Sequence, residues 1–510
     1  MNLRISQFTR AAFAALLVAT CLACSKDDDS TVDPGNTNAD GSINIDSVSF
    51  VSAAPEGDTG TAADEDDLLA NSAFSSVVSI QFGSAVTITN PLAGSGVTVT
   101  ESNGDVIINA TVAEVEYVLS GTTTNGSVKI YSDKKFKLTL NGVSITNADG
   151  PAINIQSEKR AFIVLNDNTT NSLTDGASYT ASGEEDMKAT LFSEGQMIFS
   201  GAGALSLKAN YKHAICSDDY VRIISGNITV TGAASDGIHT NDAFIADGGT
   251  VSITAAGDGI QCEEGYIVIN NGNFTVNVAD KAITASYDTD TSIDPFVTIN
   301  GGTFNIKSSA GEGIESKSVL TINNGDFNIQ TADDGLNAGS FIYINGGNIY
   351  VYSTSNDGID SNGPMTITGG RIISIAAGGP EEGFDCDRNT FKITGGILIG
   401  TGGATSSPTA NVSTQPSVIL GSGSANQLMH IRSSDGEAMT FTIPRAYNTM
   451  LFSSPKLKQG TTYQVYTGGT TAGTTDFFGL YTSGTYTAGT AGTSFTTSSM
   501  VTNAGGSSGR

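Results

Sequence analysis

The sequence predicts an all-β protein built around a right-handed, single-stranded parallel β-helix, and three observations support this. An acid-Gly-hydrophobic phrase recurs at intervals of about 22 to 31 residues, the length of one solenoid turn, beginning at Asp236, Asp258, Glu312, Asp334, Asp357 and Glu382, with Lys281-Ala282-Ile283 in the equivalent place between Asp258 and Glu312. A second phrase, in which Ile meets an Asn-Gly or Thr-Gly corner, alternates with the first at Asn300, Asn323, Asn345 and Thr368. The residues between the phrases alternate in polarity without helical periodicity, which indicates strands joined by tight turns.

Aligning the turns lets columns of equivalent residues be followed along the stack, in which successive turns lie about 4.8 Å apart. One column is apolar and is expected to point into the core: Val251, Phe274, Phe304, Phe327, Ile349 and Ile372. The corner column is mostly Asn, and stacked amides there are expected to hydrogen-bond from turn to turn. The glycines that follow these corners permit the positive φ of a sharp bend.

The N-terminal segment indicates that the protein is exported and gives no information about its fold. Residues 1–23 carry two Arg and then a short apolar run, which is typical of a signal peptide, and the following Cys24 lies in a lipobox-like sequence. We therefore expect a lipoprotein acylated at Cys24, held in the outer membrane of a Gram-negative bacterium and displayed on the cell surface. Residues 24–72 are acidic and rich in Gly, Ser and Thr, and predict a flexible tether.

The remaining chain divides by pattern. Residues 73–402 are expected to form the β-helix, with at least eleven turns and initial strands that cap its open end. Residues 403–428 predict a linker or strap, 429–502 a small C-terminal β cap, and 503–510 a disordered tail.

Several segments around the repeats resemble one known family. Tyr117–Gly121, Leu138–Ile145 and Leu451–Pro455, together with the repeated phrases, look like the β-helical carbohydrate-binding proteins related to polysaccharide lyases. The resemblance covers about residues 74–500. It implies a pectate-lyase-like β-helix that carries calcium and binds polygalacturonate and cellulose.

The composition limits the possible binding partners independently of this resemblance. The formal net charge of −27 argues against nucleic acid as a partner, and the absence of Trp argues against an indole platform for crystalline cellulose. Cys262 and Cys386 fall in one inward column but several turns apart, so no disulfide is expected. His213, His239 and His430 show no zinc-binding spacing, and we expect a monomer.

The candidate site is the acidic column and the outward position three residues after it. Stacked carboxylates repel by about 3 kcal/mol at an effective dielectric of 20, so they favour a counter-ion, and oxygen ligands from several turns favour Ca²⁺. The alternative is that Asp before Gly is ordinary turn chemistry on a solvated ridge. The candidate ligands are Asp236, Asp258, Glu312, Glu315, Asp334, Asp357, Asp360, Glu382, Asp385 and Asp387.

Three functions fit this column. We expect a protein that binds acidic plant-type polysaccharide (polygalacturonate or pectin, with cellulose as a further candidate) through calcium, assisted by Tyr343, Tyr350, Tyr352 and Lys307 as sugar contacts. A calcium-dependent polysaccharide lyase would need a basic residue to take a proton from the uronate, for which Lys281, Lys317 and Arg388 are candidates. A structural or adhesive surface protein would use calcium for stability alone. We expect binding rather than catalysis.

Overall fold

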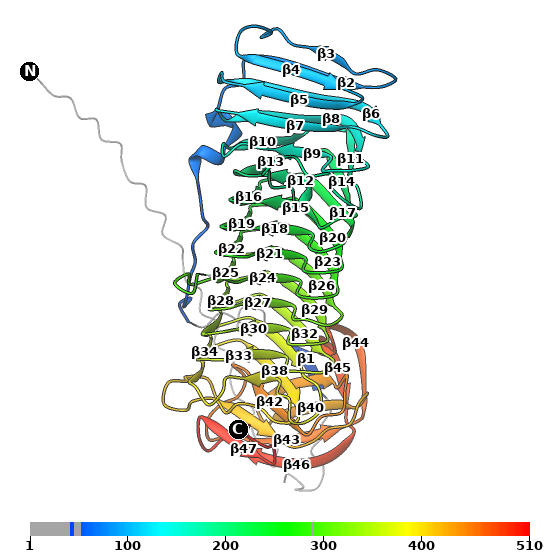
Figure 1. The fold of residues 1–510 in the computed structure, drawn as a ribbon. Helices are drawn as coiled ribbons and strands as arrows, with labels where there is room; N and C mark the ends of the chain where they lie inside the picture. The colour runs from blue at the N-terminus through cyan, green and yellow to red at the C-terminus, as the bar shows by residue number, and fades with distance from the viewer. Residues whose placement is uncertain (1–40, 45–52, 288–289, 510) are drawn as a thin grey trace, which may run out of the picture. The chain divides into compact units, whose positions relative to one another are not determined.

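A parallel β-helix forms the body of the protein, as predicted. The computed structural model describes residues 41–44, 53–287 and 290–509, so the predicted signal peptide and Cys24 lie outside the described residues. Successive turns add one strand to each of three stacks (Figure 1). Stack 1 has 13 strands: β4 (Val97–Ser102), β5 (Asp105–Ala110), β7 (Ser127–Ser132), β9 (Ile153–Ile155), β12 (Ala189–Ser193), β15 (His213–Ser217), β18 (Ile238–Thr240), β21 (Ile260–Cys262), β24 (Ile283–Ala285), β27 (Ile314–Ser316), β30 (Leu336–Ala338), β33 (Ile359–Ser361) and β36 (Phe384–Asp385).

The other two stacks flank the Asn corner. β6 (Val115–Thr123) and β8 (Phe136–Thr146) span both stacks at the N-terminal end. Stack 2 continues with β10 (Ala161–Leu165), β13 (Met197–Gly201), β16 (Tyr220–Ile223), β19 (Ala243–Ala246), β22 (Tyr266–Ile269), β25 (Phe296–Ile299), β28 (Val319–Ile322), β31 (Phe341–Ile344), β34 (Met365–Ile367) and β37 (Phe391–Ile393). Stack 3 continues with β11 (Thr170–Thr174), β14 (Ala204–Ala209), β17 (Asn227–Ala233), β20 (Thr250–Ala255), β23 (Asn273–Val278), β26 (Thr303–Ser308), β29 (Asp326–Thr331), β32 (Asn348–Ser353), β35 (Arg371–Ile375) and β38 (Ile397–Gly402).

Further strands pair with the terminal turns at both ends of stacks 2 and 3 and so cover sheet edges there. At the N-terminal end β2 (Ser76–Phe82) pairs with β6 and with β3 (Thr87–Thr89). At the other end β42 (Thr449–Ser453) pairs antiparallel with β38 and with β39 (Ser417–Leu420), which also pairs with β47 (Val501–Ala504). A separate cap sheet contains β1 (Gly41–Asn44), β40 (Leu428–Ser433), β41 (Gly436–Thr442), β43 (Thr462–Thr467), β44 (Thr470–Phe477), β45 (Leu480–Thr487) and β46 (Thr490–Thr496).

The predicted inward column forms the core. Phe274, Phe304 and Phe327 are at most 2% exposed, and their rings stack at centroid distances of 5.2 and 4.6 Å. Such offset stacks add to the free energy of simple apolar burial. Helical structure in the described part of the chain is limited to two 3₁₀ segments, η2 (Glu65–Asp67) and η3 (Leu69–Asn71). None of the described helices is long and apolar enough to span a membrane.

The corner column forms the predicted amide ladder between stacks 2 and 3. The side-chain amides of Asn300, Asn323 and Asn345 each donate from Nδ2 to Oδ1 of the preceding Asn at 2.8 Å. Thr368 continues the ladder by donating to Asn345 Oδ1 at 2.8 Å. The bend itself needs the glycine two residues after the Asn, as at Gly302, where φ is +110°.

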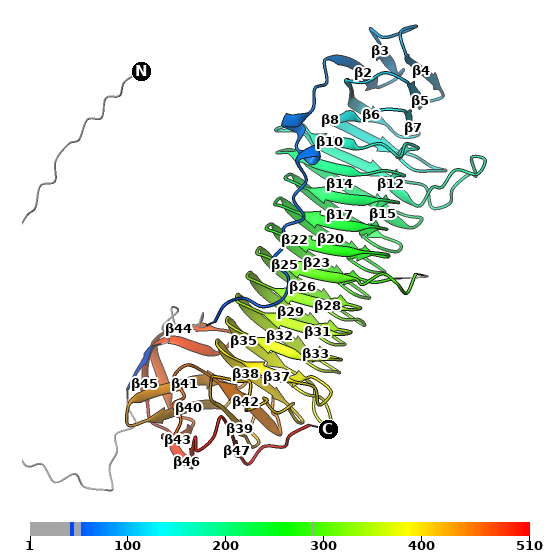
Figure 2. The same ribbon diagram turned by 90° about the vertical axis from the view of Figure 1, so that its left-hand side faces the viewer.

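Residues 53–72 differ from the predicted flexible tether. They run along the amide ladder as a strap (Figure 2), and the second Nδ2 proton of each ladder Asn goes to a strap carbonyl. Asn300 donates to Gly60 O at 2.8 Å and Asn323 donates to Asp58 O at 2.9 Å. The ladder satisfies backbone groups that a free tether would leave to water.

The acidic run of this strap is an anchor rather than a spacer. Asp67 is fully buried, and its carboxylate lies 2.8 Å from Arg160 Nε and 3.3 Å from Arg222 Nη1. Tyr220 also donates to it at 2.7 Å. A buried carboxylate is stable only with such paired partners, so this end of the strap is fixed to the β-helix.

The C-terminal residues differ from prediction in the same way. The predicted disordered tail 503–510 contains the end of β47, and Gly509 N donates to Thr405 O at 2.7 Å. The predicted linker 403–428 contains β39, which lies between β42 and β47. Neither segment has a periodic signal because each contributes a single strand to a sheet assembled from distant residues.

The ladder predicts a measurable difference between two asparagines. Asn323→Ala should lower the free energy of unfolding by about 2–4 kcal/mol, because it removes three hydrogen bonds of about 1 kcal/mol each and interrupts the partly buried ladder between Asn300 and Asn345. Urea denaturation measures this loss. The matched control is Asn305→Ala on β26, since the Asn305 amide is exposed and accepts one bond, from Asn328. Equal losses for both variants would contradict a structural ladder.

Candidate functional site

The acidic column runs along stack 1, two residues before each strand from β18 onward. One oxygen of each Asp accepts the backbone N–H of the equivalent residue in the next turn. Asp236 Oδ1 accepts from Asp258 N at 2.9 Å, and Asp334 Oδ1 accepts from Asp357 N at 3.0 Å. The column therefore helps to hold the turns together, as the turn-chemistry alternative implies, while the second oxygen of each carboxylate remains for another partner.

The middle of the column differs from the predicted calcium ligands. Lys281 takes the place of the acid there, and its Nζ lies 3.4 Å from Glu315 Oε2 and 4.0 Å from Glu312. Lys317 also pairs with Glu315, which is 2% exposed. These two glutamates already have ammonium partners, so they are poor candidates for metal ligands. The same pairs engage Lys281 and Lys317, the lysines considered as a lyase base.

The C-terminal end of the column brings three carboxylates together. Asp357, Asp360 and Asp385 each offer an oxygen, and these oxygens all lie within 4.8 Å of one another. Asp360 and Asp385 are paired residues on β33 and β36. No ion pair involves these three residues in the described part of the chain. We call this group the acidic cluster. Three convergent oxygen ligands without a cationic side chain match the ligand chemistry of Ca²⁺.

Electrostatics show the cost of the acidic cluster without a cation. Burial, and then the carboxylates of Asp334, Asp357, Asp385 and Asp387, raise the pKa of Asp360 from 3.8 to about 8. Burial, opposed by the hydrogen bond from Glu382 N and assisted by the nearby carboxylates of Asp334 and Asp385, raises the pKa of Asp357 to about 7. A bound divalent cation would remove this penalty.

Several other predicted ligands surround the cluster. Asn337 Nδ2 donates to Asp334 at 2.8 Å and to Asp360 at 3.2 Å, and so links the cluster to the turn above. Asp387 is exposed, and its N–H donates to Asp385 Oδ1 at 3.0 Å. Burial and the charges of Asp385 and Asp357 raise the pKa of Glu382 to about 8. Arg388, the third basic candidate, is exposed on the same turn.

Asp258 lies in the upper part of the column, away from the cluster. Its Oδ1 accepts from Lys281 N at 2.8 Å. Burial and the neighbouring Asp236 raise its pKa to about 7. Because Lys281 interrupts the acids after Asp258, the column is two separate acidic stretches rather than one continuous ridge.

The predicted sugar contacts do not form one platform. Tyr350 is 8% exposed and its ring stacks on Phe478 of the cap at 4.0 Å, while the Tyr352 ring lies 4.3 Å from the Arg445 guanidinium. Tyr343 stacks on Phe341 in stack 2. The cap, which the sequence could not place, therefore covers two of the three tyrosines. Lys307 is exposed on β26, apart from the acidic cluster.

The sequence spacing missed a convergence of histidines. His213 and His239 show no zinc motif along the chain, yet both lie against Asp236 in the structure. The strand register could have revealed this convergence. Ile215 pairs with Ile238, so His213, two residues before Ile215, lies one turn above Asp236 in the same column.

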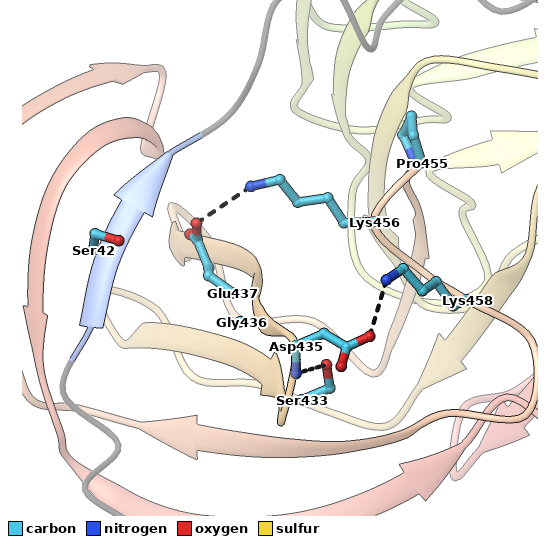
Figure 3. A pocket seen from close by; sticks show the side chains of 8 residues that line it. All are labelled: Ser42, Ser433, Asp435, Gly436, Glu437, Pro455, Lys456 and Lys458. Atoms are coloured by element: carbon cyan, nitrogen blue, oxygen red, sulfur yellow. Dashed lines mark hydrogen bonds and ion pairs between the residues drawn. The ribbon is translucent and has the colours of Figure 1, made fainter. Parts of the chain in front are cut away.

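A hollow in the cap has balanced charges. It is lined by Ser42, Ser433, Asp435, Gly436, Glu437, Pro455, Lys456 and Lys458 (Figure 3). Lys458 lies 2.9 Å from Asp435, and Lys456 lies 3.6 Å from Glu437. Each lysine therefore faces an acid of the same hollow, which leaves little net positive charge for an acidic ligand.

The raised pKa values predict a pH dependence in chelator. Because folding raises the pKa of Asp357 and Asp360 above 3.8, their contribution to stability is largest at low pH and is lost as the pH rises through about 7 and 8. The melting temperature of the chelated protein should therefore fall between about pH 5 and about pH 8, and Asp360→Asn should flatten this fall. Calorimetry across this range measures it.

The control for this experiment is Asp149→Asn, which neutralises an exposed aspartate before β9. It should leave the pH dependence of the chelated protein unchanged. A fall in melting temperature that is the same in Asp360→Asn and in Asp149→Asn would show that the acidic cluster is not its source.

Comparison with known proteins identifies the family of this chain. A family model described as a carbohydrate-binding domain-containing protein matches residues 95–358 and 297–440. A carbohydrate-binding domain-containing protein of Acetivibrio thermocellus is 35% identical over 118 residues, which are 22% of this chain and 41% of the relative, so the match spans less than half of that protein. A solved structure, titled as the polysaccharide lyase-like protein from C. thermocellum in a gadolinium derivative, covers 48% of this chain and 96% of its own at 28% identity and a TM-score of 0.39. The extent of the family match shows that this chain belongs to the carbohydrate-binding domain-containing protein family.

Proposed function

We propose that the protein binds acidic polysaccharide of the polygalacturonate type through calcium held at the acidic cluster. The observation that supports this most strongly is the convergence of Asp357, Asp360 and Asp385 within 4.8 Å without an ion pair among the described residues. Asp360 and Asp385 are only partly buried, so an ion held there would also be reachable by an external ligand.

The charge of the protein explains why calcium would be required. A net charge of −27 repels a polyuronate, whose uronate carboxylates are also negative. A Ca²⁺ ion that takes six to eight oxygen ligands has coordination positions left after three protein carboxylates. Uronate carboxylates and hydroxyls would fill these positions, so that the same ion neutralises the cluster and joins the chain to its ligand.

The surface around the cluster is compatible with an extended ligand. The strap contacts stack 2 and the Asn corner, through pairs such as Lys392–Glu56 at 2.6 Å and Thr298–Asp58 at 2.7 Å. The apolar contacts of the cap are with the outward face of stack 3, at residues such as Tyr350 and Ile373. Stack 1 carries the acidic column on a separate face, along which a linear polysaccharide could lie.

We also propose that the chain works as an outer-membrane lipoprotein displayed on the cell surface and acts as a monomer. The anchoring and the display rest on the lipobox-like sequence at Cys24 and on the acidic residues that follow it, Asp27, Asp28 and Asp29. Labelled palmitate incorporation that is lost in Cys24→Ser, together with protease accessibility on intact cells, tests the anchor and the exposure separately.

Binding of residues 25–510 to immobilised polygalacturonate tests the function. With calcium the protein should be retained, and chelator should release it. Asp360→Asn should weaken calcium-dependent retention about tenfold or more, because it removes one of three charged ligands. Asp149→Asn is the matched control and should bind like the unmodified chain. Equal retention with calcium and with chelator would contradict the proposed mechanism.

The same experiment separates binding from lyase activity. A lyase would release unsaturated uronates that absorb ultraviolet light, whereas the proposed binding protein leaves the absorbance constant. Insoluble cellulose is the second ligand to include, and its retention should not depend on calcium, because it carries no carboxylate to share the ion.

A further inference from the structure

A second group of candidate ligands lies near the N-terminal end of the same column. His213 begins β15, Asp236 stands in the equivalent position one turn below, and His239 follows Asp236 on β18. One ligand atom from each of the three residues can be chosen so that all lie within 4.8 Å of one another. The two imidazole rings stack at 4.3 Å with an angle of 27° between their planes.

The closest atoms converge on one carboxylate oxygen. His213 Nδ1 lies 2.9 Å from Asp236 Oδ2, and His239 Nδ1 lies 3.2 Å from the same oxygen. Two ligands about 2.1 Å from a shared ion, at angles between about 90° and 110°, are separated by about 3.0–3.4 Å. The separation of 3.2 Å falls within this range and that of 2.9 Å lies just below it, so both histidine nitrogens are close to the spacing of donors around one cation.

The hydrogen bonds within this group of three residues leave the buried ring of His213 incompletely paired. His213 is 2% exposed; its Nδ1 lies 2.9 Å from Asp236 Oδ2, and its Nε2 has no hydrogen-bond partner among the described residues. A buried polar group without a partner is unfavourable. Asp236 Oδ1 is already used by the N–H of Asp258 at 2.9 Å, which leaves Oδ2 directed toward the two histidines.

The surroundings of His239 resemble the support of a metal-bound imidazole. Its Nε2 lies 3.1 Å from Glu263 Oε2, so the N–H on that nitrogen can be donated to the carboxylate. This tautomer leaves the Nδ1 lone pair facing Asp236 and Gln261 Oε1, which is 3.1 Å away. A lone pair that faces two oxygens is repulsive unless a proton or a metal cation lies between them. Carboxylates that orient the distal nitrogen in this way are typical of metal-bound His.

We propose that His213, Asp236 and His239 bind a divalent transition-metal ion of the Zn²⁺ type, with Glu263 as the residue that orients His239. Two imidazoles and one carboxylate are a common zinc ligand set, with a fourth position for water or Gln261. Nitrogen donors distinguish this site from the all-oxygen acidic cluster, which favours Ca²⁺. The ion would cross-link two successive turns of stack 1, and the site does not depend on the proposed polysaccharide binding.

Titration of metal-stripped residues 25–510 with Co²⁺, a spectroscopic substitute for Zn²⁺, tests the site. One equivalent should produce visible d–d absorption that Zn²⁺ displaces. His239→Gln and His213→Gln should each weaken binding by about 100-fold or more, and Glu263→Gln by about tenfold. His430→Gln, a buried histidine of the cap, and Asp360→Asn in the acidic cluster are the controls and should leave the titration unchanged.

Two results would overturn the proposal: no d–d absorption in the unmodified chain, or titrations of His213→Gln and His239→Gln that match the titration of the unmodified chain. Circular dichroism checks that each variant folds. If a variant does not fold, X-ray absorption at the zinc edge of the unmodified chain identifies the ligands instead. Two imidazole ligands would support the site, and scattering from oxygen neighbours alone would contradict it.

Discussion

Parallel pairing in register is the constraint on which the rest of this structure depends. Each turn lies directly on the one before it, so equivalent residues of the repeat are stacked about 4.8 Å apart. Phenyl rings tolerate this arrangement, as in Phe274, Phe304 and Phe327, and side-chain amides benefit from it because each is both donor and acceptor. Carboxylates do not, since ionised Asp only accepts hydrogen bonds and repels its neighbour.

The column on stack 1 shows three local solutions to this problem. Backbone N–H groups satisfy one oxygen of Asp236, Asp258 and Asp334, a lysine at position 281 neutralises Glu315, and imidazoles approach Asp236. At the acidic cluster the backbone N–H of Glu382 satisfies one oxygen of Asp357, but no lysine or imidazole of the described residues pairs with the three carboxylates, and the pKa of Asp360 is raised to about 8. The cation chemistry proposed at the two ends of the column follows from this difference in neighbouring groups.

The sequence was sufficient for features that repeat. The β-helix, the phenylalanine core and the amide ladder all depend on a residue type recurring once per turn, and all three were predicted. Features that depend on a single contact were not predicted. The strap meets the ladder through its backbone carbonyls, which any sequence could supply, and Phe478 covers Tyr350 from a distant part of the chain. His213 was missed because its turn lacks the Asp-Gly-Ile phrase, although register places it in the column.

The presence of calcium at the acidic cluster is the central claim, and long-wavelength anomalous diffraction from crystals grown with calcium tests it most directly. The account predicts an anomalous peak about 2.3–2.6 Å from oxygens of Asp357, Asp360 and Asp385. Well-ordered carboxylates at these three residues without a peak between them would contradict it.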